Sequence, residues 1–276
     1  MDKEPYRVQS LVKAMQVLNL FILAGSKLSL SQISTALGVH KSTAYRIAIT
    51  LTEGGLLTWD NSSGTYSLGL KILELSNIVL ESFELRTLTR PHLEHLLHET
   101  GETIHLAVLD HAEMVYIDKL EGNRGVRLFS QIGKRSPIHC TALGKALLID
   151  KADRVVIKLL EKQGMKRYTS RTITSVHKFL EHLAVVRSKG YALDLEEHEP
   201  LVHCVAAPIY DHTCKVTAAI STTVVVKHFD EATFGAKISL IKETAAKISR
   251  DVGCVGVRER GTSVVYEVMQ ANPMLD

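Results

Sequence analysis

The sequence predicts an α+β protein of two domains: an N-terminal winged helix-turn-helix and, after a helical linker, a larger domain built on an antiparallel sheet. Apolar residues follow helical spacing through the first part of the chain, and a short hairpin comes next. From Glu102 onward, β-prone runs are interspersed with helices, which is typical of α+β domains. The 276 residues, 45% of them apolar, suffice for substantial cores without disulfide bonds.

Three predicted helices make up the helix-turn-helix. The first carries its apolar residues from Val8 to Ile22 at helical spacing. Ser29 is the expected N-cap of a short helix at Leu30–Leu37, which Gly38 ends. A longer helix follows at about Lys41–Glu53. A short helix, a turn containing glycine and a longer helix are the signature of this motif.

Two short β-prone runs follow the third helix. They are Leu56–Trp59 and Thr65–Leu68, joined by the polar, glycine-ended turn Asp60–Gly64. This pattern predicts a hairpin. A hairpin directly after a recognition helix is a wing, so we predict a winged helix-turn-helix DNA-binding domain over residues 1–69.

Charge is distributed unevenly in this region. No Asp or Glu occurs between Glu4 and Glu53, a stretch that contains five cations: Arg7, Lys13, Lys27, Lys41 and Arg46. A net charge of +5 there suits a phosphate backbone. The alternative is a solvated face that is acid-free by chance. Aromatic residues are only 5% of the chain, which argues against a base-stacking surface.

The start of the predicted recognition helix carries the candidate DNA contacts. Cations, hydroxyls and a phenol there can bind phosphates or base edges. The candidates are Lys41, Ser42, Thr43, Tyr45 and Arg46, with Ser63 and Thr65 on the wing as lesser ones. The alternative is an ordinary polar helix face.

The rest of the chain divides into a linker, a second domain and a tail. We predict a linker helix over residues 70–84, a domain over residues 85–252, and no assignment for the tail, residues 253–276. Pro91 is expected to lie in the first turn of a helix at Leu85–Thr100 or to kink it. The further predicted helices are Cys140–Ile149, Asp153–Gln163, Ser175–Lys189 and Glu231–Val252. The predicted strands are Thr103–Asp110, Glu113–Leu120, Val126–Gln131, Gly190–Leu193, Val202–Tyr210 and Lys215–Val226, with a polar loop at Gly133–His139.

Neither export nor disulfide bonding is expected. The start of the chain is charged, and no long uncharged apolar run follows it. The four cysteines are not spaced as a disulfide framework or as C-x-x-C pairs: they are Cys140, Cys204, Cys214 and Cys254. We therefore expect free thiols in a reducing cytoplasm.

Several segments, taken in order along the chain, resemble motifs of a known protein family. Ser10–Met15 looks like an opening helix, and Ala44-Tyr45-Arg46 lies in the third helix of the motif. Two C-terminal signatures are more specific: one is Pro137–Ala146, the other Gly190-Tyr191-Ala192 followed by Cys204–Pro208. With these pieces the chain resembles the IclR family of bacterial transcriptional regulators over about Val8–Val252. It departs from the family in its extended tail and at Leu201, where the family more often has Gly, so that loop is expected to differ in shape.

The resemblance implies a GAF-like effector domain and a regulator of transcription. Members bind operator DNA as dimers or dimers of dimers and respond to small, usually anionic metabolites. By this likeness we expect a cytoplasmic, nucleoid-associated homodimer or homotetramer that represses a catabolic operon. The expected partners are double-stranded operator DNA and a small organic-acid effector. No cofactor, no membrane contact and no enzymatic activity are expected.

The resemblance also indicates an effector pocket. The turn within Pro137–Ala146 that leads into the helix would face polar side chains from neighbouring strands. Ser221 and Thr223 are two residues apart and therefore share one face of their strand. The alternative is that these are satisfied interior polar residues. The candidates are Thr141, Ala142, Leu143, Asp194, Cys204, Ser221 and Thr223.

A second hypothesis stays open beside this one. The region of His139, Asp194 and Cys204 contains ligand types found at metal sites, so a metal-sensing or redox-sensing regulator, or a small-molecule enzyme, is the alternative. The spacing fits no established metal motif. His139 and Cys140 are adjacent in sequence and have no evident orienting partner, so we assign neither a catalytic nor a metal residue.

Overall fold

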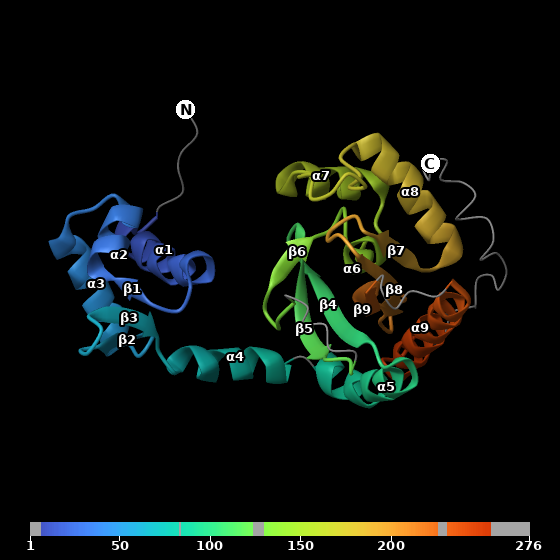
Figure 1. Cartoon of the computed structure of the whole chain (residues 1–276), viewed down its shortest axis with the longest axis horizontal. Helices are drawn as coiled ribbons and strands as arrows, with labels where there is room; N and C mark the ends of the chain where they lie inside the picture. Colours follow the sequence, from blue (N-terminus) through green and yellow to red (C-terminus); the bar gives the residue numbers. More distant parts are fainter. Residues whose placement is uncertain (1–6, 83, 124–129, 226–230, 255–276) are drawn as a thin grey trace. The chain divides into compact units, whose positions relative to one another are not determined.

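The computed structural model describes residues 7–82, 84–123, 130–225 and 231–254. The chain forms two compact units, which divide between residues 82 and 83 (Figure 1). Among the described residues, every helix is too short or too polar to cross a bilayer.

The first unit is a winged helix-turn-helix, as predicted. Its helices are α1 (Gln9–Ala24), α2 (Leu30–Leu37) and α3 (Lys41–Glu53). Ser29 caps α2 through a capping box with Gln32, which satisfies two amide groups that the first turn leaves open. Gly38 follows at φ +62°, a left-handed conformation that glycine adopts without steric cost.

The wing is a hairpin of β2 (Leu57–Asp60) and β3 (Thr65–Leu68), paired antiparallel. A two-residue strand that the sequence analysis missed, β1 (Leu28–Ser29), adds to the outer side of β3. One buried cluster joins all three helices to the sheet. It includes Val17, Phe21, Ile33, Ala44, Ala48, Leu51, Leu57 and Tyr66.

The second unit is built on a six-stranded antiparallel sheet of order β6-β5-β4-β9-β8-β7. Its strands are β4 (Thr103–Asp110), β5 (Glu113–Leu120), β6 (Arg135–Pro137), β7 (Ala192–Leu195), β8 (Val202–Tyr210) and β9 (Val216–Val225). Its helices are α5 (Glu84–Thr100), α6 (Ala142–Leu147), α7 (Asp153–Gln163), α8 (Val176–Lys189) and α9 (Glu231–Asp251). The linker helix α4 (Lys71–Ser82) belongs to the first unit.

Helices cover both faces of this sheet (Figure 1). One core lies between the sheet and α5 with α9, and the other lies between the sheet and α6, α7 and α8. Alternation along β9 separates them: Ala218 and Ile220 enter the first core, and Ala219 enters the second. Ser221 and Thr223 therefore lie on the α6 side of the sheet.

Several expected elements differ from the structure. The predicted loop Gly133–His139 contains the strand β6, and the predicted helix Cys140–Ile149 is only the six-residue α6. The strand expected at Gly190–Leu193 begins two residues later. Pro91 lies in the interior of α5 rather than in its first turn. Most of the predicted strand Val126–Gln131, and the tail from residue 255 on, lie outside the described residues.

Leu201 has φ +62° in the turn between β7 and β8, which is the conformation that a glycine there would take. Its side chain is 54% exposed, so it gains little from burial. We therefore predict that Leu201→Gly is more stable than Leu201→Ala by about 1 kcal/mol, since only Ala keeps the left-handed strain. Urea unfolding of the two variants measures the difference.

The matched control is Val185, which is exposed in the regular helix α8. There the order should reverse, with Val185→Ala more stable than Val185→Gly by about 1 kcal/mol. If glycine were the less stable residue at position 201 as well, the left-handed strain would not be there.

Candidate functional site

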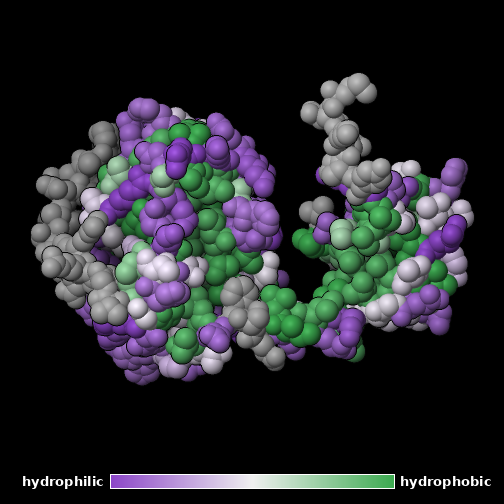
Figure 2. All heavy atoms as spheres, turned by 180° about the vertical axis from the view of Figure 1, so that it is seen from behind, coloured by the Kyte–Doolittle hydropathy of each residue, from purple (hydrophilic) through white to green (hydrophobic). Residues whose placement is uncertain are grey.

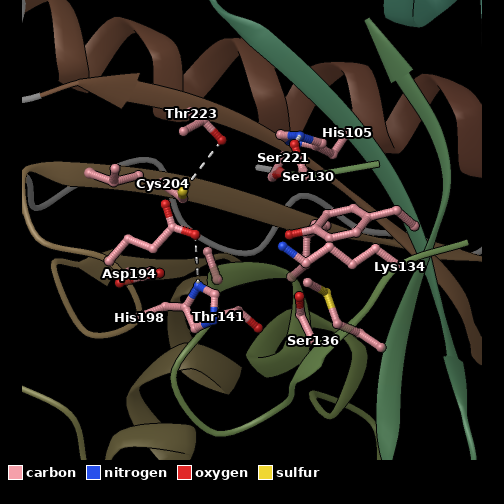
Figure 3. A pocket seen from close by; sticks show the side chains of 16 residues that line it. His105, Ser130, Lys134, Ser136, Thr141, Asp194, His198, Cys204, Ser221 and Thr223 are labelled. Carbon is pink, nitrogen blue, oxygen red and sulfur yellow. Dashed lines mark hydrogen bonds and ion pairs between the residues drawn. The ribbon is translucent and has the colours of Figure 1, made fainter. Parts of the chain in front are cut away.

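A polar cavity opens between the sheet and the start of α6 in the second unit (Figure 3). It encloses about 530 Å³, counting the part open to solvent. All seven predicted pocket residues line it: Thr141, Ala142, Leu143, Asp194, Cys204, Ser221 and Thr223. The other lining residues, which were not predicted for the effector pocket, are His105, Met114, Tyr116, Ser130, Lys134, Ser136, His198, Glu199 and Val202.

Strand register brings the side chains from the sheet together. Cys204 of β8 lies directly opposite Asp194 of β7 on one side and Thr223 of β9 on the other. Ser221 lies opposite His105 of β4. Directly opposed residues on neighbouring strands have their side chains on the same face, so four strands contribute to one polar floor.

The turn into α6 is shaped by a close backbone approach. The Thr141 hydroxyl accepts a hydrogen bond from the Gly144 amide at 3.1 Å and so caps the helix. A Cβ on Gly144 would lie 2.4 Å from the Ile138 Cα, so only glycine lets the two segments pack. The side chain of Leu143 and the small Ala142 are thereby placed at the cavity wall.

A buried ion pair fixes α6 to the segment after β7. Lys145 is fully buried, and its ammonium pairs with the Glu197 carboxylate and donates to the Leu193 carbonyl at 2.8 Å. The Glu197 amide donates in turn to Asp194 Oδ1 at 2.7 Å. The position of Asp194 in the cavity thus depends on Lys145 through one intermediate residue.

Burial raises the pKa of Asp194 to about 7, because its charged form loses hydration. Lys145 opposes this rise in the pKa, and the charge on Glu197 adds to it. Burial, together with a smaller effect of the positive charge on Lys119, lowers the pKa of His105 to about 3, so that imidazole is neutral at pH 7. Asp194 therefore exchanges its proton near neutral pH, while His105 serves as a neutral hydrogen-bonding group.

The hydroxyl groups of the cavity differ in how they are paired. Ser130 hydrogen-bonds the His105 ring at 2.7 Å, and Thr223 contacts the Cys204 sulfur at 3.4 Å. Ser221 is only 2% exposed, and its hydroxyl makes no hydrogen bond within the described part of the chain. Figure 3 shows it beside Ser130 and His105, at the opposite end of the cavity from Asp194 and His198. A buried hydroxyl that faces a cavity without a partner is free to pair with a polar group placed in that cavity.

One of the missed residues has a sequence signal. His105 lies between the buried apolar residues Ile104 and Leu106 of β4, and a polar residue within an apolar run is such a signal. Lys134, Ser136 and His198 lie in segments without a helical or strand period. Nothing local in the sequence indicates that these segments border the cavity.

The region of the alternative hypothesis has no nucleophile ready to react. Burial strongly raises the pKa of the Cys140 and Cys204 thiols, so both stay protonated at neutral pH. His139 Nε2 hydrogen-bonds the Lys166 carbonyl at 3.0 Å. Within the described residues, no three His, Cys, Asp or Glu side chains are arranged to hold a metal ion.

The predicted DNA contacts on α3 lie at the surface of the first unit. Lys41, Ser42, Tyr45 and Arg46 are exposed, and Thr43 is half-buried. The opposite face of α3, with Ala44, Ala48 and Leu51, is buried in the core. The helix thus presents its hydroxyls, phenol and cations outward.

The wing contains an acidic group that the sequence analysis did not weigh. The Asp60 carboxylate accepts hydrogen bonds from Ser62 and Ser63 and pairs with Lys27 at 3.2 Å; the serine bonds are the largest cause of its strongly lowered pKa. Ser63 is also 2.7 Å from the Thr65 hydroxyl. These two candidate phosphate contacts are therefore already engaged, which makes them weaker candidates than the residues of α3.

The linker helix α4 exposes a stripe of apolar side chains, which gather along it in Figure 2. Leu70, directly before α4, and Leu73 and Ile78 of the helix are 77%, 61% and 64% exposed. Exposed apolar stripes of this kind are typical of association surfaces.

A winged helix-turn-helix joined to a unit with a polar, partly open cavity defines a class: DNA-binding regulators that carry an effector domain. Two family models match this chain. The IclR helix-turn-helix domain matches residues 10–61, and the model described as bacterial transcriptional regulator IclR C-terminal matches residues 77–250. The chain belongs to the IclR family of bacterial transcriptional regulators.

Curated relatives support this family assignment. The chain is 35% identical to the HTH-type transcriptional regulator XynR of Escherichia coli, over 89% of this chain and 98% of that protein. It is 34% identical to KdgR of E. coli, over 92% of this chain and 96% of that one.

Solved structures agree as well. The Thermotoga maritima IclR structure covers 90% of this chain and 100% of its own, with 32% identity and a TM-score of 0.73. An IclR homologue from Microbacterium hydrocarbonoxydans, solved as a complex with 4-hydroxybenzoate, covers 88% of this chain and 98% of its own, with 25% identity and a TM-score of 0.77.

The buried pair predicts an asymmetric response to substitution. Lys145→Met should lower the free energy of unfolding by about 3–5 kcal/mol, because it leaves the Glu197 carboxylate buried without its counter-charge. The double variant Lys145→Met, Glu197→Leu should recover much of this loss, since it removes both charges. Urea unfolding of the two proteins and of the wild type gives the three values. A double variant no more stable than the single one would mean that the Lys145 side chain stabilises the domain in some way other than by this charge pairing.

Proposed function

We propose that this protein is an effector-responsive repressor that binds a small carboxylate in the cavity of its second unit. The Ser221 hydroxyl carries the proposal: it is buried, faces the cavity and has no hydrogen-bond partner among the described residues. Leaving such a group unpaired is unfavourable, so a ligand with a matching polar group gains affinity by pairing it.

The charges of the cavity favour an anion with further polar groups. Lys134 lines the cavity and supplies a positive charge, whereas the six-residue α6 has too few aligned peptides to contribute much. Asp194, with its pKa near 7, can accept a hydrogen bond from a ligand hydroxyl or, when protonated, donate one. A small hydroxylated or keto carboxylate matches this set better than an apolar ligand. The ligand of the M. hydrocarbonoxydans homologue, 4-hydroxybenzoate, has this chemistry.

In this proposal, the first unit binds operator DNA through the exposed face of α3. Residues 7–52 include cations and no acidic side chain, which favours phosphate binding. The amides at the start of α3 lack a side-chain cap that would compete with a phosphate oxygen. The ligand alters operator affinity by favouring one arrangement of the oligomer over another.

We further propose an oligomeric state, a class of target genes and a cellular location. The stripe on α4 would associate two copies into a homodimer, or four into a homotetramer, that matches a partly palindromic operator. The repressed genes would be those of a catabolic operon. The protein would act in the cytoplasm at the nucleoid, without a cofactor and without turning over its ligand.

Arg46→Ala should weaken operator binding by at least about 1 kcal/mol, because the guanidinium would lose a charge-assisted contact with a phosphate or a base. A gel-shift or anisotropy titration at fixed salt measures the change. Lys71→Ala, which removes one positive charge from α4, is the matched control and should change affinity less. Equal affinities of the Arg46→Ala protein and the wild type would exclude Arg46 from the interface.

Ser221→Ala should raise the effector concentration needed to release operator DNA by about 2- to 10-fold, because the effector would lose one hydrogen bond. The effector is first found by a thermal-shift screen of hydroxylated and keto carboxylates, 4-hydroxybenzoate included, since a ligand that binds the folded state raises its melting temperature. Operator binding without effector should stay at the wild-type level.

Thr222 supplies the control for this experiment. It is the next residue on β9, points to the opposite face, and its buried hydroxyl has no hydrogen-bond partner in the described structure. Thr222→Val should leave the effector midpoint unchanged. A Ser221→Ala midpoint equal to that of the wild type would place the effector elsewhere. Loss of operator binding without effector would make Ser221 a structural residue.

A further inference from the structure

Two cysteines outside the cavity lie in contact. Cys214, in the turn between β8 and β9, has its Sγ 2.9 Å from the Sγ of Cys254, which follows α9. A disulfide bond is about 2.05 Å long, so the two sulfurs are within an ångström of bonding distance. Cys214 is exposed to solvent and Cys254 is buried.

Other contacts hold the two segments in register. The Tyr210 amide donates to the Ser249 hydroxyl at 3.0 Å, at the start of the turn. At the end of α9, a Cβ on Gly253 would lie 3.3 Å from the Cβ of His212, so the backbone there packs directly against the turn. The Cys254 amide donates to the Ser249 carbonyl at 2.8 Å. The two thiols therefore meet because the surrounding structure positions them.

The turn itself holds Cys214 in an unfavourable conformation. The Asp211 carboxylate accepts hydrogen bonds from the Thr213 and Lys215 amides, and the Cys214 amide donates to the Asp211 carbonyl at 2.8 Å. Cys214 has φ +58°, in the left-handed region that disfavours residues with a side chain. Glycine would occupy this position without strain, so the thiol is what the cysteine adds here.

We propose that Cys214 and Cys254 are a site of reversible disulfide formation that ties the end of α9 to the β8–β9 turn when the protein meets a peroxide. The Cys214 thiolate attacks one peroxide oxygen, the O–O bond breaks, and a sulfenic acid and one water result. The Cys254 sulfur then attacks the Cys214 sulfur, the S–O bond breaks, and a second water leaves. Two thiols lose two electrons and two protons, and the peroxide takes up both.

The other two cysteines are not expected to compete. Cys140 is fully buried. Burial raises the pKa of the Cys140 thiol and of the Cys204 thiol, so neither is an effective nucleophile at neutral pH. Oxidation of the folded protein should therefore be selective for the exposed Cys214. A dithiol restores both thiols by exchange with the disulfide.

The test is hydrogen peroxide treatment of the full-length protein, followed by intact mass measurement and peptide mapping without reduction. We expect a loss of two mass units, a cross-linked peptide pair containing Cys214 and Cys254, and return to the original mass with dithiothreitol. Because the bond closes a 40-residue separation, the melting temperature of the oxidised protein should rise by about 5 °C or more.

Three variants separate the outcomes. Cys214→Ser and Cys254→Ala should each abolish the two-unit loss, whereas Cys140→Ala, which removes a buried thiol elsewhere, should retain it. Cys214 is exposed, so its variant is informative even if Cys254→Ala does not fold. Addition of oxygen atoms at Cys214 with Cys254 left as a thiol in the wild type would overturn the proposal, and so would a cross-link that involves Cys140 or Cys204.

Discussion

The effector unit depends on a lysine that is buried without access to water. An ammonium group loses its hydration on burial, and the Glu197 carboxylate and the Leu193 carbonyl stabilise the charge of Lys145. Both partners belong to the segment that carries Asp194. The charge requirement of one side chain on α6 therefore fixes the far wall of the cavity.

Local sequence patterns predicted the secondary structure well and the long-range contacts poorly. The capping box at Ser29, the alternation in β4 and β5 and the period of α7 all arise within a few residues, and these elements were predicted at or near their observed bounds. The seven cavity residues came from the family resemblance and not from periodicity. The strand β6 was not predicted, because three residues are too few to show a period. The Lys145–Glu197 pair was not predicted either, because the two residues are 52 positions apart in the sequence.

In the DNA-binding unit too, some features can be predicted from the sequence and others only from the structure. The absence of acidic residues between Glu4 and Glu53 is visible in the sequence, and the structure places the cations and hydroxyls at the start of α3 on its outer face. The role of Asp60 is not visible in the sequence, because a carboxylate in a turn looks like a solvated charge. In the structure it organises the wing and occupies the hydroxyls of Ser62 and Ser63. Asp60, whose isolated charge would repel phosphate, thus serves to shape the hairpin of the wing.

The alternation along β9 has a consequence for how relatives diverge. Ala218 and Ile220 pack in one core, while Ser221 and Thr223 face the cavity. Residues that pack in a core and residues that face the cavity thus alternate on one strand. A substitution at a cavity position changes the polar groups of the cavity and removes little packed volume, so selection can vary cavity chemistry and core packing separately. One scaffold can in this way be retuned to new metabolites through single substitutions, each leaving a protein that still folds.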